Sequence, residues 1–178
     1  MNFESDVNRV ERLAEQKEDE NWEFRCFLKG ECDLSSEEID ELFRRFADEV
    51  TSKIDCTRCA NCCKKVEPLL DSKDVERLAA FLDITSNDFC ERYLVESDEE
   101  SGFHFKSLPC PFLKDNLCTV YDARPHDCRS YPHLKKKDRV FSMNTIFSNC
   151  SICPIVYNVY ELMKRELWSP GQRGGVYW

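Results

Sequence analysis

The chain has 178 residues, of which 42% are hydrophobic and 33% charged, and its formal net charge is -9 at pH 7. No apolar run approaches the ~20 residues of a membrane span, and the charged N-terminus lacks the apolar stretch of a secretory signal. The composition therefore predicts a cytoplasmic protein without membrane contact. Its negative charge argues against nucleic acid as the main partner. Dinucleotide and P-loop motifs, which need glycine-rich loops, are also absent from the sequence.

The first half of the chain predicts helices. Residues 4–20 carry sparse apolar positions at helical spacing, and the apolar patch "WEFRCFL" that follows is expected to dock this helix. Ser35 and Glu38 form a capping-box pattern that predicts a helix leading towards Cys56. Further helices are expected from about Ser72 and from Thr85. The inner face of the capping-box helix is expected to comprise Ile39, Leu42, Phe43, Phe46 and Val50.

The second half predicts short strands and turns. "FHFKSL" alternates like a short strand, and "CPFLKDNLCTVY" reads as two extended pieces around a turn at residues 114–116. "ARPHDCRSYP" is typical of a turn or a single helical turn, and "RVFSMNTIF" is interpreted as a strand or extended segment. Cys153 is expected to cap a helix that Pro154 opens.

Together these elements predict a mainly helical α+β fold. Helices would flank a small cysteine-rich metal core that contains short strands or a hairpin. We expect a single domain over residues 1–168. It would consist of an N-terminal helical segment (1–53), a cysteine-cluster core (54–154) and a C-terminal helix (154–168), followed by a flexible tail (169–178).

Cysteine carries the strongest functional signal, with twelve residues in the chain. In a reducing cytosol such density indicates metal binding or catalysis rather than disulfides. Two C-x2-C knuckles with further cysteines favour thiolate ligation of zinc or iron. Cys26, Cys32 and Cys90 are expected to be small core residues. The candidate metal ligands are Cys56, Cys59, Cys62, Cys63, Cys110, Cys118, Cys128, Cys150 and Cys153.

The adjacent pair Cys62 and Cys63 bears on the kind of site. Neighbouring side chains diverge in extended or turn backbone, so such a pair seldom serves one mononuclear ion. Either the pair is divided between two centres, or the site is polynuclear. Nine candidates also exceed one four-thiolate site, which leaves two centres, or one cluster with additional redox or structural cysteines. His126 or His133 is an alternative ligand.

Positive side chains accompany the cysteines. A four-thiolate zinc site or an oxidised 4Fe-4S cluster carries a net charge of about -2. Lys64 and Lys65 follow the first cysteine run, and Arg124 and Arg129 stand near Cys128. We expect Lys64, Arg124 and Arg129 to stand beside the centre and donate hydrogen bonds to sulfur. The simpler interpretation is that they are surface cations.

The run "CTRCANCC", then "CPFLKDNLCTVYDARPHDCRSYP" and a later "CP", resembles the CxxCxxCC family of zinc- or iron-chelating proteins, the YkgJ-type cysteine cluster proteins. The resemblance covers residues 56–154. Where members commonly have glycine between the second and third cysteines, this chain has Ala60 and Asn61. The last ligand is either Cys150 or Cys153. The resemblance implies a metal centre whose cysteines map onto Cys56, Cys59, Cys62, Cys63, Cys110, Cys118, Cys128 and Cys153.

Three functions follow as hypotheses. The first is a metal-binding protein that holds an iron-sulfur cluster, of the 4Fe-4S type, or Zn2+; vicinal cysteines and excess thiols favour iron-sulfur. The second is a metal- or cluster-dependent modification enzyme, since related flagellin lysine N-methylases carry an iron-sulfur cluster, although they are longer. Its first candidates for substrate contacts are Asp122, Arg124, His126 and His133. The third is a zinc-scaffolded interaction protein whose acidic N-terminal helices dock a protein partner.

Overall fold

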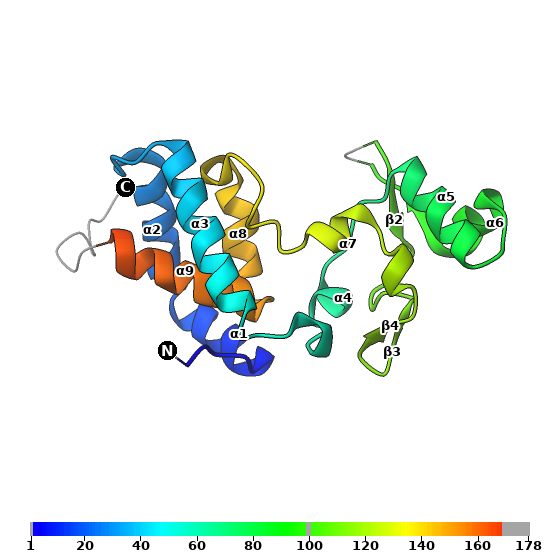
Figure 1. The fold of residues 1–178 in the computed structure, drawn as a ribbon, viewed down its shortest axis with the longest axis horizontal. Coiled ribbons are helices and arrows are strands. Elements are labelled where there is room, and N and C mark those ends of the chain that lie inside the picture. Colours follow the sequence, from blue (N-terminus) through cyan, green and yellow to red (C-terminus); the bar gives the residue numbers. More distant parts are fainter. Residues whose placement is uncertain (1, 99–100, 169–178) are drawn as a thin grey trace. The chain divides into compact units, whose positions relative to one another are not determined.

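The computed structural model describes residues 2–98 and 101–168, apart from the side chain of Arg58 (Figure 1). Contacts divide the chain into two compact units. Unit 1 comprises Met1–Cys56 and Pro132–Trp178, and unit 2 comprises Thr57–Tyr131. The expected mainly helical α+β fold is confirmed, since the described residues form helices and two short antiparallel strand pairs. The single domain over residues 1–168 stays a prediction, and the tail at 169–178 lies outside the described residues.

Unit 1 begins with α1 (Val7–Gln16) and α2 (Glu18–Gly30). The single helix expected over residues 4–20 is therefore interrupted at Lys17, whose backbone leaves helical geometry and whose N–H closes the last turn of α1. The patch "WEFRCFL" lies inside α2 and supplies its buried Phe24, Phe27 and Leu28. A charged start and an apolar end make α2 read as two separate segments in the sequence.

The capping box that opens α3 (Ser36–Thr51) is confirmed. Ser35 N–H donates to Glu38 Oε2 at 2.9 Å, and Glu38 N–H donates to Ser35 Oγ at 3.3 Å. The expected inner face is buried except for the half-buried Leu42. This face packs against α9 (Pro154–Leu167). That helix begins as predicted, with Cys153 as its N-cap and Pro154 in its first turn.

The strand or extended segment expected at residues 139–147 is wrong. The chain forms a 3-10 helix, η3 (Arg139–Ser142), followed by α8 (Met143–Asn149). Met143 and Ile146 are buried at helical spacing, which outweighs the apparent alternation. Both carboxylate oxygens of Asp40 on α3 accept backbone N–H groups at the start of η3, from Asp138 at 2.7 Å and Arg139 at 2.8 Å. Tertiary hydrogen bonding thus fixes where this helix starts.

A buried ion network joins α9 to α1 and α2. The Lys164 side chain is 2% exposed, and its ammonium donates to Glu20 at 2.6 Å, to Asn21 at 2.8 Å and to Glu161. Lys17 also pairs with Glu161. Burial alone would raise the pKa of Glu161, but the two ammonium groups outweigh burial and lower that pKa below 4.5. The network therefore holds a carboxylate charged inside unit 1.

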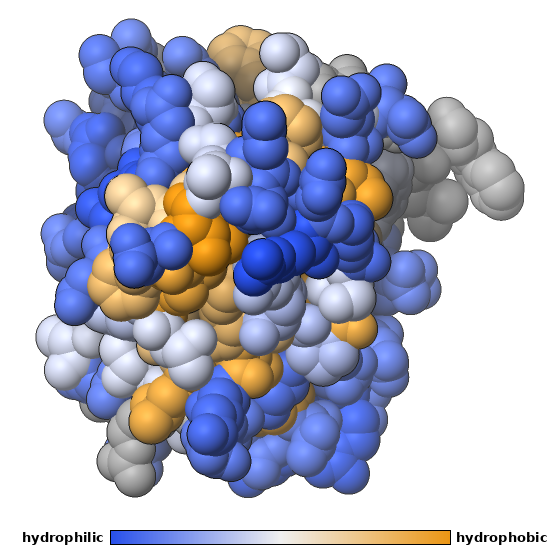
Figure 2. Space-filling model, turned by 90° about the vertical axis from the view of Figure 1, so that its right-hand side faces the viewer, coloured by the Kyte–Doolittle hydropathy of each residue, from blue (hydrophilic) through white to orange (hydrophobic). Residues whose placement is uncertain are grey.

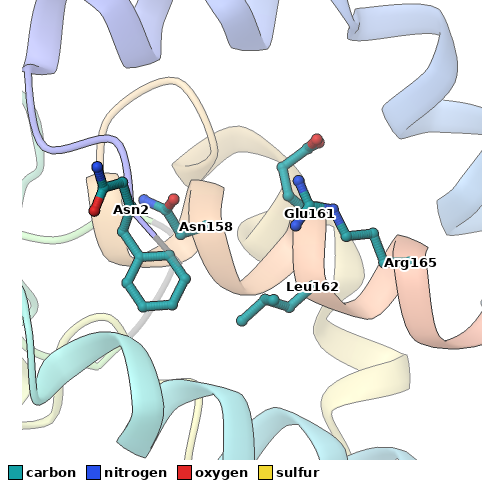
Figure 3. Close-up of a pocket in the computed structure, with 6 residues that line it drawn as sticks. Asn2, Asn158, Glu161, Leu162 and Arg165 are labelled. Atoms are coloured by element: carbon teal, nitrogen blue, oxygen red, sulfur yellow. The ribbon is translucent and has the colours of Figure 1, made fainter.

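A small pocket of unit 1 lies beside this network (Figure 3). Several of its lining side chains come from α9, and the others come from the N-terminal segment. None of the predicted metal ligands lines it. The lining residues are Asn2, Phe3, Asn158, Glu161, Leu162 and Arg165.

Unit 2 is built on α5 (Ser72–Phe81), α6 (Ser86–Tyr93) and the strand pair β1 (Leu94–Glu96) and β2 (Phe103–Phe105). Both helix starts are confirmed, with caps at Asp71 and Thr85. The strand expected in "FHFKSL" is β2, but its partner β1 was not anticipated. The pair is antiparallel, with Leu94 opposite Phe105. The core consists of Leu70, Val75, Leu78, Ala79, Phe89, Leu94, Phe105, Phe112, Val120 and Ala123.

The remaining elements carry most of the cysteine motifs and are short, so surrounding contacts rather than their own length must hold them. They are the 3-10 helix η1 (Cys56–Arg58), α4 (Cys62–Lys65), β3 (Leu113–Lys114), β4 (Leu117–Cys118), the 3-10 helix η2 (Tyr121–Ala123) and α7 (His126–Ser130).

The surface mixes polar and apolar groups. Figure 2 shows apolar side chains gathered among charged ones on one face. No helix in residues 2–98 or 101–168 combines the length and apolar character needed to cross a membrane. In unit 2 the most exposed large apolar residues are Phe81, Val95, Leu108, Leu117 and Tyr121.

Replacing Glu161 by Gln is expected to lower the free energy of unfolding by about 1.5–3 kcal/mol at neutral pH, because hydrogen bonds between charged groups are lost. The folded-state pKa of Glu161 lies below its unfolded value of 4.5. Its contribution is therefore complete above the unfolded pKa and is lost as pH falls through the folded one. Urea unfolding should be measured from about pH 7 to about pH 3. The unfolding free energies of wild type and Glu161→Gln should become more similar as the pH falls.

The control is Glu166→Gln, which lies on the same helix as Glu161 and breaks an exposed pair with Arg45 of α3. It should change the free energy of unfolding by at most about 1 kcal/mol. If the unfolding free energies of wild type and Glu161→Gln differ by the same amount at every pH, Glu161 is not held charged in the folded protein.

Candidate metal centre

The predicted ligands divide between the two units. Six lie in unit 2, in three segments that are distant in the sequence, and the other three lie in unit 1. None of the twelve cysteines, all within the described part of the chain, forms a disulfide. The unit 2 candidates are Cys59, Cys62, Cys63, Cys110, Cys118 and Cys128, and the unit 1 candidates are Cys56, Cys150 and Cys153.

The first segment turns sharply between its cysteines. Ala60 has a φ of +53°, in the left-handed region, whereas Asn61 is helical with a φ of -66°. Ala60 therefore occupies the conformation that glycine adopts most easily. The turn leads into α4, where the thiols of Cys62 and Cys63 are hydrogen-bonded to each other. We expected these neighbours to diverge; the helical turn keeps them together.

The second segment is a hairpin. Leu113 pairs with Cys118 and Lys114 with Leu117, so Asp115 and Asn116 form a two-residue loop. Both loop residues have positive φ, at 51° and 62°, as a type I′ turn requires. This confirms the turn expected at residues 114–116.

The hairpin is fixed next to α4. The backbone N–H of Cys110 donates to the carbonyl of Cys63 at 2.8 Å. Cys110 and Cys118 both pack against the apolar core of unit 2. The backbone groups of Phe112 and Val120 hydrogen-bond to these two thiols, respectively, and favour their thiolate forms. The hairpin thus presents two core-packed thiols, each with a backbone hydrogen bond.

The third segment is α7, which contains Cys128. Its first N–H, from His126, donates to Asp74 Oδ1 at 3.0 Å. Leu69 N–H donates to Asp127 Oδ2 at 3.4 Å. These bonds tie α7 to the start of α5 and to the segment before it. Cys128 interacts electrostatically with Cys63, Cys110 and Cys118, so the structure brings all three segments together.

Burial makes three of these thiols poor acids. It raises the pKa of Cys110 to about 11 and that of Cys128 to about 12, and it also raises the pKa of Cys118. Cys63 differs, because the hydrogen bond from Cys62, aided by Lys64 and Arg124, lowers its pKa to about 7. A bound cation would offset the charge of the buried thiolates and lower the pKa values that burial raises.

The thiols fit a soft metal in kind and in number. Cys63, Cys110, Cys118 and Cys128 interact electrostatically with one another. The thiol of Cys62 is hydrogen-bonded to that of Cys63. Within the described residues no three Cys, His, Asp or Glu side chains already stand in a ligating arrangement.

The predicted cations have different surroundings. Lys64 is exposed beside Cys63. Arg129 donates to two backbone carbonyls, from Nε to Arg124 at 3.0 Å and from Nη2 to Asp122 at 2.6 Å. The Arg124 guanidinium lies 3.8 Å from the centroid of the Tyr121 ring and interacts electrostatically with Cys63 and Cys118. Only Arg124 and Lys64 are thus linked to the thiols by the contacts described.

Two residues that hold the site were missed from the sequence. Arg77 on α5 donates from Nε to the carbonyl of Ala123 at 3.2 Å and from Nη2 to that of Arg124 at 3.0 Å. Its partner is the buried Asp74, which also binds His126 N–H. A capping signal was present, since Asp74 follows the N-cap Asp71 by three residues. The hydrogen bond that Asp74 accepts from His126, 52 residues later, could not be predicted from the sequence.

The three candidate ligands in unit 1 differ from one another in exposure and in their contacts. Cys56 is exposed, and Cys153 is buried at the start of α9. Cys150 is 2% exposed, and its thiol donates to the carbonyl of Ile146 at 3.4 Å. Burial raises the pKa of Cys150. Ligation by these three cysteines stays a prediction. Among the other candidates, His126 and Asp122 are exposed in unit 2, and His133 belongs to unit 1.

Comparison with known families gives one match. Residues 55–154 match the model of the CxxCxxCC family, described as "Putative zinc- or iron-chelating domain". The match covers more than half of the chain and confirms the resemblance seen in the cysteine motifs. It supports the binding of zinc or iron. No solved structure matches the chain.

Replacing Asp74 by Ala is expected to lower the free energy of unfolding by about 2–4 kcal/mol, because Arg77 and the backbone N–H of His126 lose their buried acceptor. Thermal or urea unfolding measures the effect. Asp88→Ala is the matched control, since Asp88 occupies the same position in the first turn of α6 but is only half-buried. It should have a much smaller effect. Equal effects would show that capping alone explains Asp74.

Replacing Ala60 by Gly is expected to stabilise the protein by about 1 kcal/mol, because the left-handed conformation is unfavourable for alanine. Asn61→Gly should do the opposite, since Asn61 is helical and buried. Unfolding free energies of the two variants provide the measurement. A loss of stability in Ala60→Gly would contradict the left-handed turn at this position.

Proposed function

The chain belongs to the CxxCxxCC family, and on that premise we propose that unit 2 holds an iron-sulfur cluster of the 4Fe-4S type. The cluster would draw its ligands from the thiolates of Cys59, Cys62, Cys63, Cys110, Cys118 and Cys128. The observation that carries this proposal is the gathering of thiols from α4, the β3–β4 hairpin and α7 in one part of unit 2. Thiolates are the usual ligands of such clusters.

Iron-sulfur is favoured over zinc by the number and spacing of the thiols. Four cysteines satisfy a structural zinc ion, and unit 2 supplies six candidates. The hydrogen-bonded neighbours Cys62 and Cys63 suit a polynuclear centre better than a single tetrahedral ion. Zn2+ is the alternative, because soft thiolate sites serve both metals.

The chain's own residues would provide the setting of the centre. Cys110 and Cys118 pack against the core of unit 2, and the Cys62 thiol stabilises the thiolate of Cys63. Lys64 and Arg124 would add positive charge beside the ligands, and Arg129 would hold the loop that carries Arg124. When bound, an iron-sulfur cluster supplies one-electron redox chemistry, whereas zinc supplies a structural cross-link or a Lewis acid.

Further parts of the hypothesis stay predictions. They are the cytoplasmic location, a protein partner for the acidic N-terminal helices, and ligation by Cys56, Cys150 and Cys153. Whether the centre serves a modification enzyme depends first on which metal is present.

The test is metal and acid-labile sulfide analysis of protein purified without air, with an absorbance spectrum of the same sample. We expect several irons, matching sulfide and a broad band near ~400 nm from thiolate-ligated iron. One or two zinc ions without sulfide or a visible band would replace the cluster by a zinc site. Protein that binds neither metal, even after reconstitution, would overturn the proposal.

Cysteine variants then locate the ligands. Cys59→Ser and Cys128→Ser should lower the metal content and destabilise the protein, because metal binding is coupled to folding. Cys90→Ser is the matched control, since Cys90 packs against the core of unit 2 but belongs to none of the cysteine motifs in the sequence. It should leave the metal content unchanged. Equal metal loss in all three would contradict this division. The same assay on Cys56→Ser, Cys150→Ser and Cys153→Ser tests the unit 1 candidates.

A further inference from the structure

Arg124 has a buried hydrogen-bond donor that no described residue uses. Its Nε is buried and has no partner within residues 2–98 and 101–168. Buried side-chain donors in proteins are nearly always hydrogen-bonded, so each exception calls for an explanation. An acceptor that joins the site only in its loaded form is one such explanation. Arg124 is therefore the place to look for a contact with a ligand.

The surroundings of Arg124 hold it in place. Its guanidinium lies 3.8 Å from the centroid of the Tyr121 ring, within the range of a cation–π contact. Its backbone is extended, as expected before a proline. Arg77 and Arg129 both donate to its carbonyl, each at 3.0 Å. The side chain thus projects from a backbone that two other arginines hold fixed.

These neighbouring arginines have different tasks. Arg77 pairs with Asp74 and donates to backbone carbonyls, and Arg129 donates to the carbonyls of Asp122 and Arg124. Their described hydrogen bonds therefore shape the loop. Only Arg124 combines an unused buried donor with electrostatic contact to two candidate ligands, Cys63 and Cys118.

We infer that Arg124 donates a hydrogen bond from Nε to a metal-bound sulfur of this centre, and so positions and stabilises the loaded site. The inference rests on the proposed function, because the acceptor exists only when thiolates hold a metal. A thiolate bound to a metal keeps negative charge and accepts hydrogen bonds from such groups. Tyr121 serves as the platform that keeps the guanidinium in place.

The decisive variant is Arg124→Lys, which keeps the charge and removes the planar Nε donor. Metal-free protein is titrated with Zn2+ in competition with a chromogenic chelator. Loss of a hydrogen bond to a ligand typically weakens metal affinity about 10- to 100-fold, and we expect at least about 10-fold here. Arg92→Lys, an exposed substitution on α6, is the matched control and should leave the affinity unchanged.

Two further variants separate the hydrogen bond from charge and from folding. Lys64→Gln removes a charge that also acts on Cys63 and should weaken zinc binding less than Arg124→Lys. Tyr121→Leu removes the platform at a partly exposed position, and should weaken binding while leaving the metal-free fold intact. The unfolding of metal-free Arg124→Lys is measured in parallel. It should match that of the wild type, because the donor has no partner in the metal-free protein.

The outcomes distinguish the inference from its premise. If the wild type binds zinc and Arg124→Lys binds it equally well, the inference is overturned, and the iron and sulfide analysis still decides the proposed function separately. If metal-free Arg124→Lys is destabilised as much as the zinc-loaded form, Arg124 is a structural residue and the inference is again overturned. If the wild type binds neither zinc nor iron, the proposed function fails, and this inference fails with it.

Discussion

Burial of thiols against the apolar core of unit 2 is the constraint on which the candidate site depends. Cys110 and Cys118 touch this core, and Cys128 is held beside them by α7. A buried thiolate without a counter-charge is costly, so these residues stay neutral thiols until a cation arrives. The core therefore disfavours the thiolate forms of these cysteines in the absence of a counter-charge.

Polar contacts then align the three cysteine segments on that core. Asp74 receives a hydrogen bond from α7 and pairs with Arg77, which in turn holds the carbonyls of Ala123 and Arg124. The hairpin is fixed to α4 by one backbone hydrogen bond between Cys110 and Cys63. The elements themselves are too short to be stable alone. Their positions are consequently a property of the whole unit, not of the motif residues.

The sequence predicted the helix starts that depend on residues close together in the chain. The capping box at Ser35, the caps at Asp71 and Thr85 and the proline start of α9 involve residues a few positions apart, so each could be read from the printed sequence. Family motifs supplied the candidate ligands. Contacts across the fold could not be read in this way. The start of η3 depends on Asp40, about a hundred residues earlier, and the roles of Arg124 and Arg129 differ only through their three-dimensional neighbours.

Unit 2 is continuous in the sequence, whereas unit 1 is made of one segment before it and one after it. Helix α3 needs α9 to cover its apolar face, and α9 is the last helix described. Because domains fold from the N-terminus during synthesis, all of unit 2 leaves the ribosome before α9 is available. The cysteines of unit 2 are thus synthesised while α1, α2 and α3 still lack their partner. Translation order places the completion of unit 2 ahead of the closure of unit 1.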